Sequence, residues 1–422
     1  MKWDITVDRL LASRLPQSTK RRLVILTGAR QTGKTTLCRT LYPELRYLNL
    51  DALENREWVR EVSAFRWARD VGTAVIDEAQ KESAVFEKVK YAFDEGTLDF
   101  TVLTGSAQLL LLSQVRESLA GRAFVYELWP LMLCELAATI LGSAPVPPIY
   151  RAMAEGRLLS EVLQELSPLP APEREQALAD LLRYMLRWGG MPELLRLDGS
   201  EREEWMRSYE ITYLERDLGD LARLTDLLPF KKFQRLAALR SGCMLVYSEL
   251  AKESGFSSET ARRYLEYLRL SYQAFLLQPY HTNLTSQVVK TPKVYWGDVG
   301  LLRQLTGQSG GVSGSLLETF VVAELNKWVR STGADLKLFY YRTRSGLEVD
   351  LLLESKKGLY GIEIKSAVRV DPGDAAGLRQ VAEAAGKSWL GGMVVHQGRK
   401  LELLCEPAIW AVPVGRLCSG EE

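Results

Sequence analysis

The sequence has few of the residues from which structural metal sites are built. Only two histidines, His281 and His396, occur among 422 residues, and the five cysteines are scattered, with no CxxC pair. Structural zinc sites need four such ligands at short spacings, so we expect none here. Scattered cysteines in odd number also fit a reducing compartment, and we therefore expect a cytoplasmic protein.

Long apolar runs and an excess of one charge are missing as well. No run approaches the ~18 apolar residues of a membrane span. The first residues, Met1-Lys2-Trp3-Asp4, lack the apolar region of a signal peptide, and we expect no membrane partner. Lys and Arg number 54 against 53 Asp and Glu, so any surface for nucleic acid must be local.

What is present is the composition of an ordinary globular protein, with 46% hydrophobic and 25% charged residues. At about 150 residues per domain, the length predicts several units. We expect an α/β unit over residues 1–140, a Pro-rich connector and helical lid over 141–205, a helical, winged-helix-like unit over 206–310 and a small α/β unit over 311–422.

Short apolar runs alternate with helical patterns in the first unit. The predicted strands cover residues 23–26, 47–51, 73–76 and 100–103. Continuous apolar runs are typical of strands buried on both faces, and their alternation with helices predicts a parallel sheet in an α/β fold.

The segment from Gly28 to Thr35 matches the phosphate-binding pattern GxxxxGK[ST], between a predicted strand and a predicted helix. Backbone N–H groups of such a loop converge on phosphate oxygens, and the helix N-terminus favours anions. Lys34 would reach the β- and γ-phosphates, and the Thr35 hydroxyl would bind Mg²⁺. The predicted ligands are ATP and Mg²⁺, and the predicted nucleotide-binding residues are Gly28, Ala29, Arg30, Gln31, Thr32, Gly33, Lys34, Thr35 and Thr36.

The third predicted strand ends in two acids. Asp77 would hold Mg²⁺, directly or through water, and Glu78 would polarise the attacking water. After the fourth strand, Thr104 and Ser106 are both sensor candidates, with a plain strand-end turn as the alternative. Arg122 is either an arginine finger, acting in cis or from a neighbouring subunit, or a structural salt-bridge residue.

These motifs resemble a family of prokaryotic AAA-type ATPases with an uncharacterised C-terminal module. The resemblance rests on the segments 26–37, 75–79, 103–106, 119–122 and 128–131 of the ATPase part. Further segments, at 188–193, 213–217, 293–301, 317–318 and 346–350, resemble the C-terminal module. The resemblance spans nearly the whole chain in order and is thinnest around residues 143–175. It implies an ATPase joined to a second module of unassigned cellular role.

Residues 247–265 predict a helix, a tight turn and a second helix. Gly255 suits the turn, and Ser257 or Ser258 can cap the second helix. Between residues 230 and 293 the sequence has ten Lys and Arg against four Asp and Glu, a local basic excess. Arg262 and Arg263 are therefore candidate DNA-binding residues, and a winged-helix fold used for protein contacts is the alternative. Residues 287–307 are expected to form short strands and turns.

The last unit carries an acid, Asp350, within one predicted strand. After a gap, the sequence Glu363-Ile364-Lys365 follows in the next predicted strand. Alternation along a strand places Glu363 and Lys365 on one face, where Asp350 on the adjacent strand can join Glu363 on Mg²⁺ or Mn²⁺. Lys365 would orient or activate water, or stabilise the pentavalent phosphorus, and Glu318 would be an accessory residue. This pattern resembles the PD-(D/E)xK restriction-endonuclease-like superfamily. The alternatives are a solvated salt bridge and a nuclease fold that is inactive or only binds.

Together these features predict a Mg²⁺-dependent ATPase whose C-terminal module binds DNA. Whether this module also cleaves DNA is left open by the sequence. The alternative is a nucleotide-driven regulatory switch or oligomeric scaffold that binds protein partners, with a catalytically silent nuclease-like domain. An arginine finger acting in trans would require a homo-oligomer.

Overall fold

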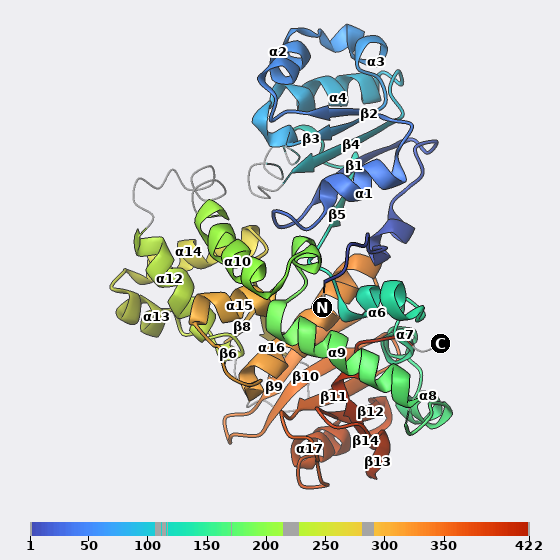
Figure 1. Cartoon of the computed structure of the whole chain (residues 1–422), viewed down its shortest axis with the longest axis vertical. Helices are drawn as coiled ribbons and strands as arrows, with labels where there is room; N and C mark the ends of the chain where they lie inside the picture. The colour runs from blue at the N-terminus through green and yellow to red at the C-terminus, as the bar shows by residue number, and fades with distance from the viewer. Residues whose placement is uncertain are drawn as a thin grey trace.

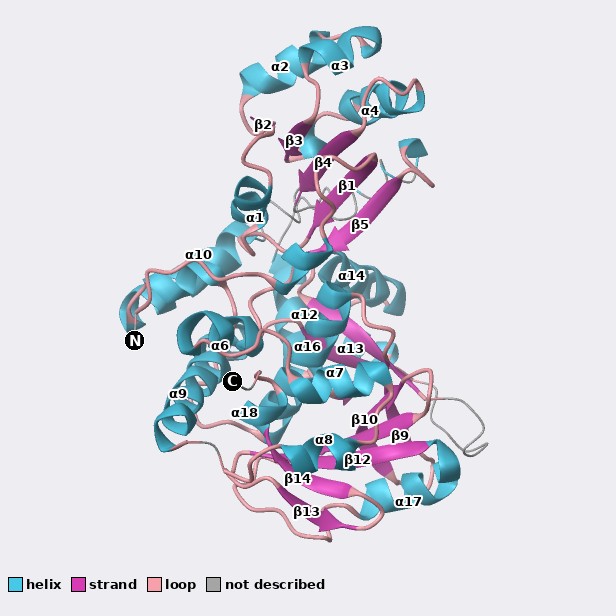
Figure 2. Cartoon of the chain, turned by 90° about the vertical axis from the view of Figure 1, so that its right-hand side faces the viewer, coloured by secondary structure: helices cyan, strands magenta, loops and turns pink. Residues whose placement is uncertain are grey.

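The computed structural model describes residues 2–105, 111, 115, 117–169, 171–213, 228–280 and 291–420. A five-stranded sheet lies at one end of the long axis, and strands of a second sheet lie at the other end (Figures 1 and 2). No helix of the described residues is both long and apolar enough to pass through a membrane.

The first sheet is entirely parallel, with strand order β2-β3-β4-β1-β5. The strands are β1 (Arg22–Thr27), β2 (Arg46–Asn49), β3 (Ala74–Asp77), β4 (Phe100–Gly105) and β5 (Ala123–Glu127). The parallel α/β prediction is confirmed. The fifth strand was not predicted: it is an edge strand that leaves Phe124 and Val125 exposed, so it lacks a continuous buried run.

Helices cover both faces of this sheet. They are η1 (Leu10–Arg14), α1 (Lys34–Leu41), α2 (Leu53–Glu61), η2 (Ala64–Arg66), α3 (Trp67–Asp70), η3 (Ala79–Lys81) and α4 (Ala84–Asp94). Because side chains alternate along a strand, Val24 and Leu26 of β1 pack in the cluster that contains Leu37 of α1. Leu23 and Ile25 pack in the cluster of α2 and α4 on the other face.

A second sheet of nine strands has the order β13-β14-β12-β11-β10-β9-β7-β8-β6. Its strands are β6 (Cys243–Met244), β7 (Ala274–Pro279), β8 (Lys293–Trp296), β9 (Lys337–Arg342), β10 (Glu348–Glu354), β11 (Leu359–Ile364), β12 (Trp389–His396), β13 (Glu402–Cys405) and β14 (Ile409–Pro413). The parallel pair β7–β9 joins the strands that follow the helix pair to those of the last unit.

The predicted helix-turn-helix is present. It consists of α13 (Tyr247–Ser254) and α14 (Ser258–Leu270), preceded by α12 (Leu228–Leu239). Gly255 ends α13 with φ 80°, a left-handed conformation that glycine adopts at low cost. Ser257 caps α14 by accepting a hydrogen bond from the Thr260 backbone N–H at 3.1 Å. The expectation of short strands and turns over 287–307 is wrong for residues 299–306, which form α15 (Val299–Thr306). Asp298 is the N-cap residue of this helix.

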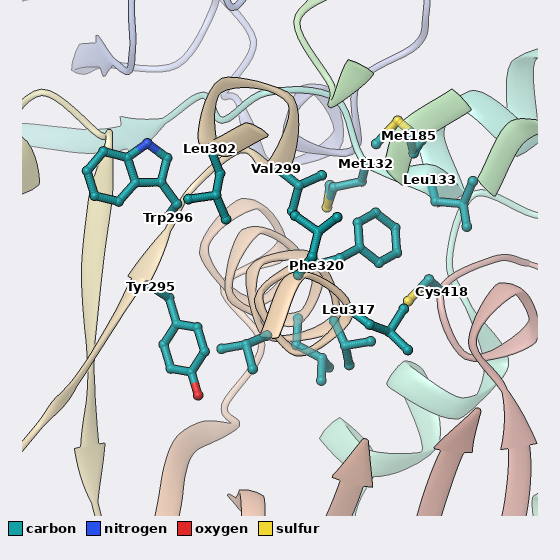
Figure 3. Close-up of a cluster of buried hydrophobic side chains, with 14 of the residues drawn as sticks. Met132, Leu133, Met185, Tyr295, Trp296, Val299, Leu302, Leu317, Phe320 and Cys418 are labelled. Carbon is teal, nitrogen blue, oxygen red and sulfur yellow. The ribbon is translucent and has the colours of Figure 1, made fainter. Parts of the chain in front are cut away.

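One large apolar core surrounds the 19-residue helix α16 (Gly314–Thr332). Leu317 and Phe320 of α16 lie among side chains from other parts of the chain, including Met132, Met185 and Val299 (Figure 3). The remaining helices are α6 (Leu133–Leu141), α7 (Pro148–Glu155), α8 (Leu159–Glu165), α9 (Pro172–Trp188), η4 (Pro192–Arg196), α10 (Gly199–Tyr213), α17 (Ala376–Ala385), η6 (Gly386–Ser388) and α18 (Val414–Leu417).

Candidate functional site

The loop between β1 and α1 has the backbone of an anion-binding turn. Gly33 caps α1 with φ 96°, and Gln31 is also left-handed at φ 60°. A Cβ atom at Gly28 would lie 2.1 Å from the Leu128 carbonyl oxygen, so only glycine fits there. The loop therefore presents the N-terminus of α1 to its ligand.

Lys34 is buried at the start of α1. Its Nζ donates to the carbonyl oxygens of Gly28 at 2.9 Å and Ala29 at 2.8 Å. These acceptors belong to the same loop that would surround the phosphates. The ammonium group is thus already placed inside the loop, where phosphate oxygens can replace the carbonyl oxygens.

Asp77, at the end of β3, joins several predicted residues. Its Oδ2 accepts a hydrogen bond from the Thr35 hydroxyl at 2.7 Å, and its Oδ1 accepts one from Thr104 at 3.0 Å. Tyr47 of β2, which sequence reasoning missed, also donates its hydroxyl to Oδ2. Of the two sensor candidates, Thr104 touches Asp77, and Ser106 lies outside the described residues.

Glu78 follows Asp77 in a left-handed conformation with φ 55°. Burial raises the pKa of its carboxyl group, and the nearby Lys34 ammonium and a hydrogen bond from Gln80 oppose this shift. Gln80 Nε2 donates to Glu78 Oε2 at 2.5 Å. The two adjacent acids therefore have different environments: Asp77 receives three hydroxyl donors, and Glu78 is a partly desolvated carboxyl group.

A cavity of about 710 Å³ opens beside these residues. One wall is the phosphate-binding loop with Asp77 and Glu78. The other includes residues 5–9, η4 and Trp205 of α10. Sequence reasoning missed this second wall, because its members lie up to about 170 residues from the loop and carry no nucleotide-binding motif.

Arg9 ties this wall to the loop. Its NH1 donates to the Thr32 carbonyl oxygen at 2.8 Å and its NH2 to the Trp129 carbonyl oxygen at 2.5 Å. Its guanidinium also pairs with the buried Glu135 at 3.3 Å. Glu135 in turn accepts the backbone N–H of Leu10 at 2.8 Å, so one carboxylate holds the N-terminal segment beside the loop.

The structure places Arg122 away from this cavity. Its Nε lies 2.6 Å from Asp94 Oδ1 on the surface of the first α/β unit, and it is not among the cavity-lining residues. Within the described chain Arg122 therefore forms a salt bridge with Asp94, which was the alternative to an arginine finger acting in cis. A finger acting in trans stays a prediction.

The C-terminal acids lie on neighbouring strands. In the antiparallel pair β10–β11, Leu351 is opposite Ile362, which brings Asp350 and Glu363 to adjacent positions. Asp350 Oδ2 accepts the Ile364 backbone N–H at 2.8 Å, and Lys365 donates to Glu363 at 2.8 Å. Burial, followed by the charges of Glu318 and Glu363, raises the pKa of Asp350.

Glu318, the predicted accessory acid, meets residues that sequence reasoning missed. Lys293 of β8 lies 3.0 Å from Glu318 Oε1 and 2.8 Å from Glu348 Oε1. Tyr295 donates its hydroxyl to Glu318 at 2.5 Å. Across the residues that the structure describes, no group of three or more His, Cys, Asp or Glu side chains is placed to hold a metal ion.

Arg262 and Arg263 are exposed on α14. The Arg262 guanidinium carbon lies 5.0 Å from the centre of the Tyr247 ring, and that of Arg263 lies 5.9 Å from the Tyr264 ring. The second turn of α14 thus presents two cations to the surface.

Three family models match the chain. Residues 20–137 match the AAA domain, residues 179–311 match a domain of unknown function, DUF8612, and residues 313–417 match a second one, DUF4143. The first match contains the phosphate-binding loop, Asp77 and Glu78. This part of the chain is therefore a P-loop ATPase domain of the AAA type. The other two matches carry no assigned function.

Similar proteins add little about function. Two uncharacterized proteins, from Mycobacterium bovis and Mycobacterium tuberculosis, are each 29% identical over 359 residues, which is 81% of this chain and 70% of theirs. The Walker-type ATPase PABY2304 of Pyrococcus abyssi aligns over 70% of this chain and 94% of its own, at 17% identity and a TM-score of 0.41. A score below 0.5 supports no functional comparison.

Proposed function

We propose that this chain is a Mg²⁺-dependent ATPase that couples ATP binding and hydrolysis to DNA binding and DNA cleavage by its C-terminal part. The observation that carries the ATPase proposal is the grouping of Lys34, Thr35 and Asp77 with Glu78 on one wall of the 710 Å³ cavity. The cleavage proposal rests on the pairing of Asp350 and Glu363 described above.

At the ATPase site each residue has a separate role. Lys34 binds the β- and γ-phosphates, and the Thr35 hydroxyl and Asp77 carboxylate, 2.7 Å apart, hold Mg²⁺. Oxygen donors of this kind fit Mg²⁺, which neutralises phosphate charge when bound. Glu78 accepts the proton of the attacking water, and Thr104 senses the nucleotide state through Asp77.

The middle of the chain supports DNA binding. The elements α12, β6, α13, α14, β7 and β8 follow one another in the order of a winged-helix fold. Arg262 and Arg263 project from α14, in the region with the local basic excess. We infer that these two residues contact DNA phosphates, since cations on one exposed helix face supply such contacts.

The C-terminal acids support phosphodiester hydrolysis. Asp350 and Glu363 offer two carboxylates, and the buried Glu363 Oε2 has no hydrogen-bond partner among the described residues. One or two carboxylates, completed by waters and substrate phosphate, are typical of Mg²⁺ sites. The ion would polarise the phosphate, and Lys365 would orient the attacking water.

A second function is favoured by the ion pairs of Lys293. Lys293 pairs with Glu318, and no group of three metal-binding side chains occurs among the described residues. This arrangement suits a nuclease-like domain that does not cleave. The protein would then be a nucleotide-driven switch that binds protein partners, alone or as a homo-oligomer. DNA would not stimulate its ATP hydrolysis.

Plasmid nicking tests both functions. Wild type is incubated with supercoiled plasmid and Mg²⁺ or Mn²⁺, with and without ATP, beside Asp350→Ala and Lys34→Ala. We expect Asp350→Ala to lose nicking but keep ATP turnover, and Lys34→Ala to lose ATP turnover and the effect of ATP on nicking. The matched control is Asp335→Ala, which removes an exposed aspartate of the same part of the chain.

Absence of nicking under every condition, in a folded protein that hydrolyses ATP, contradicts the cleavage proposal and favours the switch. ATP turnover at the wild-type rate in Lys34→Ala contradicts the ATPase site assignment.

A further inference from the structure

The nuclease-like acids lie in a larger cluster of charges than the sequence pattern contains. Its carboxylates come from α16, β10 and β11, and its cations from β8, β9 and the end of β11. The members are Glu318, Glu348, Asp350 and Glu363, with Lys293, Arg342 and Lys365. Four potential negative charges thus face three positive ones.

Lys293 is the most buried of these cations, with its side chain 4% exposed. Its ammonium group bridges Glu318 and Glu348, at 3.0 and 2.8 Å, and lies 5.5 Å from the centre of the Tyr340 ring. Burial alone would lower the pKa of Lys293, but the carboxylates outweigh it, and its pKa lies above the ordinary value. The ammonium group is therefore a permanent charge of the cluster.

The bridge changes which carboxylates are free for an added cation. Glu318 Oε1 takes both Lys293 and the Tyr295 hydroxyl, and Glu348 takes Lys293 and Arg342 at 2.8 Å each. Asp350, by contrast, accepts a hydrogen bond from the Ile364 N–H, and Glu363 has a buried oxygen with no partner in the described chain.

We propose that Lys293 is a positioning residue that holds Glu318 and Glu348 out of metal coordination and so limits the site to two carboxylate ligands, Asp350 and Glu363. This inference rests on the proposed metal site. Lys293 lies in the region 179–311, which matches one family model, and Asp350 and Glu363 lie in the region 313–417, which matches another. The proposed metal site therefore spans both regions.

The experiment measures Mn²⁺ binding by isothermal titration to the full-length, nucleotide-free protein. Lys293→Met keeps the length of the side chain and removes its charge, which frees Glu318 to act as a third carboxylate. Tyr295 and Arg342 still support Glu318 and Glu348, so the variant is expected to fold, which a thermal melt checks. We expect its dissociation constant for Mn²⁺ to fall about tenfold.

Three further variants define the cause. Lys293→Arg keeps the cation and should bind Mn²⁺ as wild type does. Lys293→Met combined with Glu318→Gln removes the freed carboxylate and should return the affinity to the wild-type value. Asp350→Asn identifies the Mn²⁺ binding that belongs to this site. When it is added to wild type or to any of the other variants, that Mn²⁺ binding should disappear.

The outcomes separate the inference from the proposed function. Binding that depends on Asp350 but is equal or weaker in Lys293→Met overturns the inference and leaves the proposed site standing. The inference is also overturned if tighter binding persists without Glu318. Asp350-dependent binding that appears only in Lys293→Met supports the inference and contradicts cleavage by the native chain. No Asp350-dependent binding in any variant overturns both.

Discussion

At the residue scale, two neighbouring acids differ in what surrounds them. Asp77 accepts hydrogen bonds from the hydroxyl groups of Thr35, Thr104 and Tyr47. Glu78 has a left-handed backbone, and burial desolvates its carboxyl group. Such a division suits one acid that holds a cation and another that accepts a proton.

The pH dependence of ATP turnover follows from this difference. Only ionised Glu78 accepts a proton, and burial raises its pKa above the ordinary value of 4.5. Turnover should therefore fall as the pH drops through the raised pKa, with the midpoint of kcat above pH 4.5. Glu78→Gln should lower kcat by about 100-fold or more. Steady-state assays across the acid range measure both.

The control for this prediction is Glu61→Gln, which changes an exposed glutamate at the end of α2 and should keep the wild-type profile. An acid limb centred below pH 4.5 would contradict the role of Glu78 as the proton acceptor.

At the element scale, the Arg9–Glu135 pair joins three segments that are far apart in sequence. Arg9 precedes η1, Glu135 lies in the first turn of α6, and the Thr32 carbonyl oxygen belongs to the phosphate-binding loop. The side chains of Arg9 and Glu135 are 8% and 1% exposed, so the ion pair is shielded from water. Removal of one partner from such a pair leaves an uncompensated buried charge.

Glu135→Gln should therefore destabilise the protein by about 3 kcal/mol, since it keeps the shape of the side chain but leaves Arg9 unpaired. Urea denaturation measures the free energy of unfolding. Asp335→Ala breaks an ion pair whose side chains are 82% and 60% exposed, and it should cost less than about 1 kcal/mol. Equal losses in the two variants would show that the Arg9–Glu135 pair has no special weight.

At the scale of the whole molecule, the cavity beside the phosphate-binding loop has walls from two parts of the chain. The loop belongs to the AAA match over 20–137, while η4 and α10 belong to the match over 179–311. Helix α16 packs against both the start of α6 and the nine-stranded sheet, through Leu133, Phe320 and neighbours (Figure 3).

Trp205 tests whether the second wall binds nucleotide. It lines the cavity from α10 and stacks on Tyr209 with ring centres 5.1 Å apart. Trp205→Ala should weaken ATP binding about tenfold, because an aromatic wall contributes a large apolar contact area. Titration calorimetry measures the dissociation constant.

The matched control is Trp58→Ala in α2, which removes a partly buried tryptophan outside the cavity lining. If both variants bind ATP equally, the nucleotide does not reach α10.

The sequence alone determined the features that depend on neighbouring residues. The phosphate-binding loop, the two acids at the end of β3 and the turn at Gly255 could be predicted, because each needs only a local backbone shape and a short spacing. The same holds for the alternation that places Glu363 of β11 beside Lys365, the residue that follows this strand. Asp350 and Glu363 were predicted as partners because adjacent strands bring such positions together.

Only the tertiary structure decided which distant groups complete these sites. Arg9 and Trp205 belong to no motif, and Lys293 begins the segment 293–301 but had no predicted site role. The contacts of Arg9 with Thr32 and of Lys293 with Glu318, and the place of Trp205 in the cavity wall, arise only on folding. The edge strand β5 was missed because it gains its hydrogen bonds from β1 rather than from an apolar pattern of its own. Burial and long-range charge pairing depend on the complete packing, which a local pattern of residues does not contain.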